Sequence, residues 1–296
     1  MPNKTISSFI FNSESLTAFS NLSTKIEDIY VDKSDYEEKI QNAKKYLSEL
    51  HEKFYNYTQN SLVIIFQAPD AAGKDGTIKT VFSDINPFGI SFQAFKRPDT
   101  NELDHDFLWR FNQVLPRRGH WAVFNRSYYE DVIVPQVHPE FVINNPQFPD
   151  YLKNNIADLI THRLEDINNY EKYLNRNGTK IIKFYLHLSK TEQAERLKER
   201  LINPEKHWKF DPNDIIERNH WKSFQNAYFK TFQQTNTPIA PWFVIPADDK
   251  KNMRLLVLFI LIDILEEFLQ TVEPTSKFSK QEIETFLSEI NKQDIE

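Results

Sequence analysis

One stretch, residues 61–82, constrains the fold of this chain more than any other. It begins with an apolar run at residues 62–66 that is rich in β-branched side chains, which is typical of a buried strand. Residues 70–77 follow as a loop that places Gly73 and Gly76 around Lys74, and a helix-like segment continues to Phe82. A strand, a small-residue loop and a helix in this order predict a site where backbone N–H groups and a lysine converge on a phosphate group.

The loop departs from the phosphate-loop pattern G-x-x-x-x-G-K-[ST] at two positions. Ala68 stands in place of the first glycine, and Asp75 in place of the Ser or Thr whose hydroxyl ligates Mg²⁺. We therefore expect carboxylates to hold the metal, with Asp70 and Asp75 as candidates. The alternative is a glycine-containing turn with a solvated Lys74, which the preceding strand and the nearby acids disfavour.

Composition indicates which partners and which cellular location to expect. The net charge of −6 gives no general attraction to nucleic acid or to an anionic membrane, so we expect neither as a partner. The absence of cysteine excludes disulfides and thiolate chemistry. The first residues lack an apolar core long enough for a signal peptide, so we expect a cytoplasmic protein. The apolar residues 253–269 are interrupted by Asp263 and predict a core helix, with a membrane anchor as the weaker alternative.

Periodicity along the chain predicts an α/β protein with a mainly parallel sheet. We expect an N-terminal arm at 1–34, a single domain at 35–272 with a lid at about 190–212, and a charged tail at 273–296. We predict helices at 35–57, 102–115, 151–175, 191–201 and 214–232, strands at 62–66, 90–95, 121–124, 180–188 and 242–245, and a long loop at 135–150.

Cations and acids follow several of the predicted strands. Lys96 and Arg97 end the strand at 90–95, and in a parallel sheet they lie on the same edge as the phosphate loop, although two solvated surface cations are an equal alternative. The strand at 121–124 is followed by Arg126 and by Glu130 and Asp131. An arginine and an acid at this place can serve phosphates and Mg²⁺, while an exposed acidic first turn of a helix is the alternative.

The helix at 191–201 carries Arg196 and Arg200 four residues apart, hence on one face. A break rich in cations and carrying Trp208 follows it. This combination suits a lid that closes over phosphoryl oxygens, and a solvated helix is the alternative. A nucleotide base could rest on the loop after the last strand, at 246–250, where a plain surface turn is equally plausible.

Taken together, these segments resemble the polyphosphate kinase 2 family, in particular its class III branch. The similarity runs from about residue 35 to residue 269 and rests on separate motifs in the same order: AxDAAGKDGT, FKRP, DHDFLWR, FNRSYYEDV, RLxxR with NPEKHWKF, and PADDK. The resemblance implies a thymidylate-kinase-like phosphate-loop fold of three α/β/α layers with a helical lid. It also implies Mg²⁺, with Mn²⁺ as a substitute, inorganic polyphosphate as phosphoryl donor, AMP, ADP, GMP or GDP as acceptor, and a homo-oligomer.

The resemblance also implies roles for individual residues. The implied catalytic residues are Asp70, Lys74, Arg126, Asp131, Arg196 and Arg200, with Asp70 and Asp131 as metal ligands. The implied substrate contacts are Ala71, Ala72, Gly73, Asp75, Gly76 and Thr77 in the phosphate loop, Asn125 and Glu130 for the choice between mono- and diphosphates, and Lys79, Lys96, Arg97, Arg117, Arg118, Lys206 and Lys209 along a polyphosphate track near the same edge of the sheet.

Two other functions fit the same pattern. An ATP-dependent nucleoside or nucleotide kinase would use the same fold. A non-catalytic nucleotide-binding regulator could carry the altered phosphate loop with Ala68 and Asp75, although the set of acids and arginines disfavours it.

Overall fold

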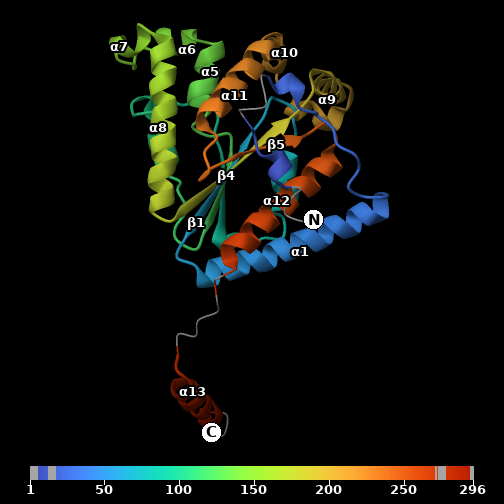
Figure 1. Cartoon of the computed structure of the whole chain (residues 1–296), viewed down its shortest axis with the longest axis vertical. Coiled ribbons are helices and arrows are strands. Elements are labelled where there is room, and N and C mark those ends of the chain that lie inside the picture. The colour runs from blue at the N-terminus through green and yellow to red at the C-terminus, as the bar shows by residue number, and fades with distance from the viewer. Residues whose placement is uncertain (1–5, 13–17, 271, 273–277, 294–296) are drawn as a thin grey trace.

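A single sheet of five strands forms the centre of the structure (Figure 1). The computed structural model describes residues 6–12, 18–270, 272 and 278–293. The strands are β1 Ser61–Gln67, β2 Ile90–Ala94, β3 Trp121–Asn125, β4 Thr179–His187 and β5 Trp242–Pro246. They lie in the order β2-β3-β1-β4-β5, and all four neighbouring pairs are parallel. The predicted strands and the parallel sheet are confirmed.

Helices connect these strands and cover the sheet. The α-helices are α1 Lys33–Tyr57, α2 Lys74–Val81, α3 Thr100–Leu103, α4 Trp109–Asn112, α5 Glu130–Val137, α6 Glu140–Ile143, α7 Asp150–Lys153, α8 Ile156–Arg176, α9 Lys190–Ile202, α10 Asn213–Asn219, α11 Trp221–Thr235, α12 Lys250–Leu269 and α13 Lys280–Gln293. Short 3-10 helices are η1 Ile6–Phe9, η2 Phe19–Asn21, η3 Pro87–Gly89 and η4 Pro204–Lys209.

Two hydrophobic cores lie on opposite faces of the sheet. Successive residues of β1 point to opposite faces, so that Ile64 joins the core under α1 and α12 while Ile65 joins the core under α5, α8 and α11. Every residue of β1 is buried, as expected for a central parallel strand covered on both sides. Figure 1 shows α1 and α12 on one side of the strands and α8 and α11 on the other. The predicted three-layer α/β/α architecture is confirmed.

The order of the strands places a binding edge at the end of β1. The chain adds β3 and β2 on one side of β1 and β4 and β5 on the other. The loops after β1 and β3 therefore separate toward opposite sides of the sheet at its carboxyl edge, which is where open parallel sheets bind ligands. The phosphate loop leaves β1 at this point.

Two predicted helices are each divided in the structure. The helix predicted at 102–115 is α3 and α4, because the Asp106 carboxylate accepts a hydrogen bond from the Leu108 N–H at 2.9 Å and forms a turn between them. The helix predicted at 214–232 is α10 and α11, which meet at His220. Both predictions were right about helix formation and wrong about continuity.

The loop predicted at 135–150 is partly helical. Helix α5 continues through Pro135 to Val137, and α6 follows at Glu140–Ile143. A proline inside a helix leaves the carbonyl four residues earlier without its N–H partner. Here that carbonyl belongs to Asp131, and Nη1 of Arg163 on α8 donates to it at 2.7 Å. The tertiary contact replaces the missing bond and allows the helix to continue.

The N-terminal arm packs on the domain where it is described. Phe11 and Phe19 are each 2% exposed, and the Phe11 N–H donates to the Trp242 carbonyl on β5 at 2.8 Å. The predicted core helix at 253–269 is confirmed, because α12 buries most of its length against the sheet. In the described part of the chain, no helix combines the length and the apolarity that crossing a membrane requires. Helix α13, in the predicted tail, buries none of its described residues.

Candidate active site

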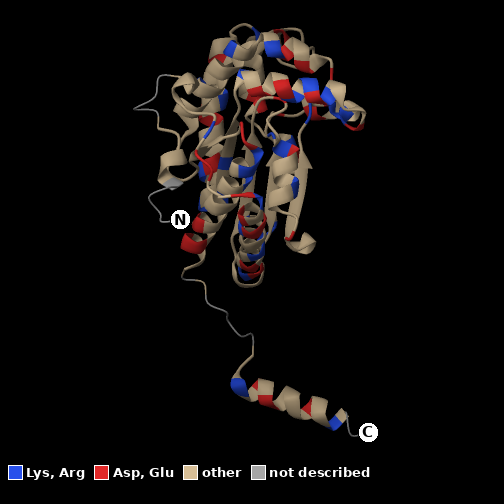
Figure 2. Cartoon of the chain, turned by 90° about the vertical axis from the view of Figure 1, so that its right-hand side faces the viewer, with Lys and Arg blue, Asp and Glu red and all other residues tan. Residues whose placement is uncertain are grey.

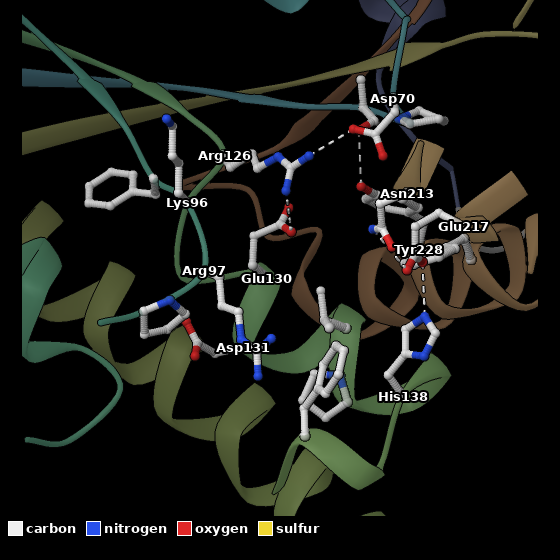
Figure 3. Close-up of a pocket in the computed structure, with 18 of the residues that line it drawn as sticks. Asp70, Lys96, Arg97, Arg126, Glu130, Asp131, His138, Asn213, Glu217 and Tyr228 are labelled. Carbon is white, nitrogen blue, oxygen red and sulfur yellow. Dashed lines mark hydrogen bonds and ion pairs between the residues drawn. The ribbon is translucent and has the colours of Figure 1, made fainter. Parts of the chain in front are cut away.

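The carboxyl edge of the sheet opens into a cavity of about 580 Å³ (Figure 3). It lies between the ends of β1, β2 and β3 and helices α5, α6, α8, α9, α10 and α11. Six residues implied by the sequence line it: Asp70, Lys96, Arg97, Arg126, Glu130 and Asp131. Figure 2 shows acidic and basic residues mixed over the helices at this end of the domain, opposite α13. Charge of both signs therefore surrounds the cavity.

The phosphate loop adopts backbone conformations that small residues tolerate best. Gly73 has φ 100° and Ala71 has φ 63°, both in the left-handed region. Gly73 then precedes α2 without any side-chain cap, so the first N–H groups of α2 have no side-chain acceptor from this residue. Thr77 uses its hydroxyl within the helix, donating to the Gly73 carbonyl at 3.0 Å. The strained turn and the uncapped helix N-terminus suit an anion site.

Lys74 lies behind the loop rather than in the cavity. Its ammonium donates to the carbonyls of Ala68 at 3.0 Å and Pro69 at 3.4 Å, and both of these residues line the cavity. Burial lowers the pKa of Lys74, and the nearby positive charge of Arg126 lowers it further, while Asp70 raises it. Lys74 is thus close enough to the cavity residues to interact with them electrostatically, and its catalytic role stays a prediction.

Arg196 is also placed behind the loop. Its Nη1 donates to the carbonyls of Ala72 at 2.8 Å and Ala71 at 3.3 Å, and its Nη2 to those of Ala247 at 2.7 Å and Asp248 at 3.1 Å. Its Nε donates to Glu192. In this arrangement Arg196 ties the phosphate loop to the end of β5 and does not line the cavity. That it contacts phosphoryl oxygens stays a prediction.

The cavity-facing charges centre on Arg126. Its Nη2 lies 2.7 Å from Oδ1 of Asp70, and its Nη1 lies 3.6 Å from Oε2 of Glu130 (Figure 3). The Glu130 carboxylate raises the pKa of Arg126 against the opposing effect of burial, and Asp70 raises it as well. The guanidinium is therefore held charged and oriented beside the phosphate loop.

The backbone of Arg126 explains this orientation. Arg126 has φ 65°, a left-handed conformation that costs a non-glycine residue energy, and its N–H donates to the Phe66 carbonyl at the end of β1 at 2.9 Å. The chain thus turns sharply where β3 ends. Asn125, the last residue of β3, donates to Asp75 Oδ1 at 2.6 Å and ties the same turn to the start of α2. Neither Asn125 nor Asp75 lines the cavity.

A buried ion pair between Lys183 and Glu171 holds the segment that leads into α5. Lys183 on β4 is fully buried, and its Nζ lies 2.9 Å from Glu171 Oε2 and from the Tyr129 hydroxyl. The hydroxyls of Tyr128 and Tyr129 both donate to Glu171 Oε1, at 2.9 and 2.7 Å. These tyrosines lie between Arg126 and Glu130 in the chain, so the network fixes the segment that carries both charges.

Asp131 lies on the opposite side of the Arg126–Glu130 pair from Asp70 (Figure 3). Burial raises its pKa to about 6, against the lowering effect of Arg163 and Arg110. Its Oδ2 has no hydrogen-bond partner in the part of the chain that the structure describes, and it lies 3.7 Å from Arg110 Nη2. The structure therefore does not bring Asp131 and Asp70 together as a pair, and the prediction that Asp131 shares a metal with Asp70 gains no support from this arrangement.

The structure brings only part of the predicted polyphosphate track to the cavity, and the binding of polyphosphate there stays a prediction. Lys96 and Arg97 line the cavity, as the position after β2 predicts. Arg117 and Arg118 precede β3 and therefore lie at the amino edge of the sheet, where Arg118 donates to the Gln59 carbonyl before β1 at 2.9 Å. β3 has five residues, about 17 Å of extended chain, so the expectation that these two arginines lie near the site is wrong.

Other predicted contacts lie outside the cavity. Lys79 is exposed on α2, Lys206 pairs with Glu199, and Lys209 Nζ lies 5.0 Å from the Trp208 ring. None of these lysines is among the lining residues. The loop at 246–250, considered for the base, uses the Asp248 carboxylate to cap α9 and to bind Thr24, so it does not form part of the cavity either.

The lid is joined to the phosphate loop by specific bonds. Arg200 donates to Asp214 Oδ2 at 2.9 Å and so connects α9 to α10. Gln193 Nε2 donates to the Asp70 carbonyl at 3.0 Å, and Arg218 Nη1 donates to Gln193 Oε1 at 2.8 Å. Arg200 reaches the cavity only through Asp214, which lines it. These bonds connect the segment predicted as a lid to the phosphate loop; that it closes over the cavity stays a prediction.

Sequence reasoning missed many of the residues that line the cavity. The missed residues include Arg110, His138, Phe141, Arg163, Gln193, Glu217, Arg218, Trp221, Phe224 and Tyr228. Arg110 and Arg163 lie in segments that were predicted as helices from the spacing of their apolar residues. That spacing gives no information about where the arginine side chains point. The His138 contact to Glu217 joins residues 79 positions apart, which no local pattern reveals.

The donor groups present fit a Mg²⁺ ion shared with substrate. No cluster of three or more His, Asp or Glu side chains that could hold a metal occurs among the described residues. Mg²⁺ in phosphoryl-transfer sites is commonly bound by one or two carboxylates together with substrate phosphates. Asp70 presents a partly exposed carboxylate at the phosphate loop, whereas Asp75 is paired with Asn125. Asp70 is therefore the residue that suits such an ion.

Comparison with known proteins agrees with this geometry. Residues 30–272 match the family model described as polyphosphate kinase 2. The chain is 41% identical over 261 residues to an ADP-polyphosphate phosphotransferase from Rhodopseudomonas palustris, covering 88% of this chain and 89% of the relative. It is 40% identical over 240 residues to an AMP/ADP-polyphosphate phosphotransferase from Meiothermus ruber, covering 80% and 84%.

A solved structure shows the same fold. The crystal structure of polyphosphate kinase 2 from Arthrobacter aurescens TC1 aligns with a TM-score of 0.84 and 32% identity, covering 95% of each chain. The predicted phosphate-loop kinase fold is thereby confirmed, and the family match spans the sheet, the phosphate loop, the Arg126 cluster and the lid. The chain belongs to the polyphosphate kinase 2 family.

Proposed function

We propose that this protein transfers a phosphoryl group between inorganic polyphosphate and nucleoside mono- and diphosphates, with AMP, ADP, GMP and GDP as acceptors. The observation that carries the proposal is the Arg126 guanidinium, held by Asp70 and Glu130 in a cavity beside the phosphate loop. The similar proteins from Rhodopseudomonas palustris and Meiothermus ruber are named for phosphotransfer between polyphosphate and ADP or AMP/ADP.

The residues that line the cavity have different roles in such a transfer. Arg126 binds the equatorial oxygens of the transferring group, and Lys96 and Arg97 bind neighbouring phosphates. Glu130 keeps Arg126 charged and fixes its direction. An acceptor phosphate is already ionised at neutral pH, so the reaction needs alignment of donor and acceptor more than a strong general base.

Asp70 is proposed to hold Mg²⁺ together with substrate phosphates. The bound ion would neutralise charge on the phosphoryl oxygens. Around it, the chain supplies the fixed parts: the uncapped N-terminus of α2, the Lys74 ammonium behind the loop, and the Arg126 guanidinium in front of it. Closure of the lid excludes water, which would otherwise compete with the nucleotide as acceptor.

A donor assay tests the proposal. Purified protein with Mg²⁺, long-chain polyphosphate and either AMP or ADP is expected to form ATP, with ADP preceding ATP when AMP is supplied. ATP formed from ADP alone would keep the transfer and exclude the predicted class III acceptance of monophosphates. Transfer that requires ATP as donor would identify an ATP-dependent nucleotide kinase instead. Nucleotide binding with no product from either donor would identify a regulator.

A further inference from the structure

The end of the cavity away from the phosphate loop contains a carboxylate fixed by a histidine. His138, the residue after α5, has its Nε2 2.9 Å from Glu217 Oε2 and its Nδ1 3.0 Å from Glu140 Oε1 (Figure 3). Two carboxylate partners favour the imidazolium, in which both ring nitrogens donate. Glu217 lines the cavity, whereas Glu140 does not and has a side chain that is 51% exposed.

One oxygen of Glu217 remains available to a ligand. His138 occupies Oε2, and among the described residues the only hydrogen-bond partner of Oε1 is Asn213 Nδ2 at a long 3.5 Å. The side chain is 21% exposed. An ionised carboxylate can accept hydrogen bonds and cannot donate them. This wall of the cavity therefore offers an acceptor in a fixed position.

Aromatic rings surround the same histidine. The Phe141 ring lies 5.2 Å from that of His138 at an interplanar angle of 26°, and the Phe224 ring lies 6.0 Å away. Trp221, the first residue of α11, lines the cavity as well. The Arg97 guanidinium lies 4.9 Å over the Phe141 ring, so the aromatic side chains left to a planar ligand at this end are Trp221 and Phe224. Nucleobases stack on side chains of this kind.

The distance between the two ends of the cavity matches a nucleotide. Helix α5 has eight residues, from Glu130 to Val137, so His138 follows Glu130 by about 12 Å along the axis of an α-helix. This is comparable with the span of a nucleotide from its terminal phosphates to its base. On the α10 side, the carboxylates of Asp211 and Glu217 line the cavity, Asp214 is paired with Arg200, and the Arg218 guanidinium donates to Gln193 and to the Lys190 carbonyl. This wall is therefore less favourable to a polyanion than the Arg126 end, and a neutral base is compatible with it.

We infer that the His138 end of the cavity binds the nucleobase and that Glu217, oriented by His138, recognises the 6-amino group of adenine. Oε1 of Glu217 accepts a hydrogen bond from that amino group. A 6-oxo base such as hypoxanthine or guanine presents an acceptor at this position, so adenine nucleotides are favoured over GMP and GDP without excluding those as acceptors. This inference rests on the proposed function only for the identity of the ligand as a nucleotide, and it concerns binding rather than phosphoryl transfer.

Calorimetric titration of the full chain with ADP and with inosine diphosphate, without polyphosphate, tests the inference. The two ligands have the same size and the same phosphates. The wild-type protein is expected to bind ADP about tenfold more tightly than inosine diphosphate. In the complex with inosine diphosphate, the hydrogen bond from the amino group to Glu217 is lost and two acceptor oxygens face each other. In Glu217→Gln the amide oxygen pairs with His138 and the NH₂ group faces the base, so the preference is expected to disappear or reverse.

Glu140→Gln is the matched control, because it changes the other carboxylate partner of His138 at a residue outside the cavity wall. It is expected to retain the wild-type preference for ADP. Equal binding of both ligands by the wild type, a preference unchanged in Glu217→Gln, or an equal loss in both variants would overturn the inference. A transfer assay run in parallel distinguishes this inference from the proposed function. If the ADP preference depends on Glu217 but no product forms from polyphosphate, the proposed function is refuted and this inference stands.

Discussion

Nη2 of Arg126 lies 2.7 Å from Oδ1 of Asp70, although the two residues leave different strands and are 56 positions apart. Their contact joins the loop after β1 to the loop after β3 at the edge where the sheet opens into the cavity. It brings an acid and a fixed cation to the place where the proposed phosphoryl transfer needs both.

Replacing Arg126 with lysine removes the planar donor pair while keeping the positive charge. Lysine cannot bind Asp70 and a phosphoryl group with two oriented N–H groups at once, so kcat is expected to fall by about 100-fold or more. Steady-state kinetics with polyphosphate and ADP measure the change. Arg117→Lys is the control at the opposite edge of the sheet, and an equal effect of both substitutions would contradict the assigned position of the site.

Gly73→Ala should damage the phosphate loop more than Gly76→Ala does. Gly73 has φ 100°, so alanine there is strained by about 1–2 kcal/mol, although the surrounding space would accept a Cβ. Gly76 lies inside α2, where alanine favours the helix, and its added Cβ would meet only the flexible end of Arg254 at 3.2 Å. Urea denaturation and activity assays should rank the two variants in this order, and equal tolerance would argue against a strained loop.

Lys183→Met is expected to destabilise the protein by about 3–5 kcal/mol, because it leaves the buried Glu171 carboxylate without its cation. The double variant Lys183→Met/Glu171→Leu removes both charges and should recover most of the loss. Lys198→Met breaks an exposed pair with Glu195 and should change the unfolding free energy very little. A double variant as unstable as the single one would show that the tyrosine contacts, not the ion pair, hold this segment.

The stability contributed by His138 should depend on pH. Burial lowers its pKa, but the carboxylates of Glu217 and Glu140 outweigh burial and raise it overall; His220, with its ring 4.8 Å away, also faces it. A raised pKa in the folded state means that the contribution is fully present below the ordinary pKa of about 6.5 and is lost as pH rises through the folded-state pKa.

The difference in unfolding free energy between the wild type and His138→Gln should therefore be largest near pH 6 and shrink toward pH 9. Chemical denaturation at a series of pH values measures this difference. A gap that stays constant across the range would mean that His138 stabilises the protein as a neutral ring.

The sequence predicted the parts of the fold that depend on local pattern. Three segments were predicted from residue types alone: the buried strand at 62–66, the glycine-containing loop around Lys74 and the apolar helix at 253–269. The structure agrees with each of them. Lys96 and Arg97 were also placed correctly, because a cation that follows a parallel strand must lie at the carboxyl edge.

The remaining features depend on contacts that local pattern does not contain. Arg117 and Arg118 were predicted to lie near the site because they are cations close to a predicted strand. They precede that strand, however, and therefore lie at the amino edge of the sheet, away from the phosphate loop. The continuation of α5 through Pro135 requires the bond from Arg163, which comes from another helix. Arg196 looked like a free lid arginine, although carbonyls from two other segments use its donors.

The most direct test of the central claim follows both phosphorus pools at once. ³¹P NMR of protein, Mg²⁺, polyphosphate and ADP should show the terminal residues of the polyphosphate chain consumed one for one with the appearance of the γ-phosphate of ATP, and Arg126→Ala should stop both changes together. ATP formed without loss of polyphosphate, or polyphosphate lost only to orthophosphate, would contradict transfer from polyphosphate to the nucleotide at this site.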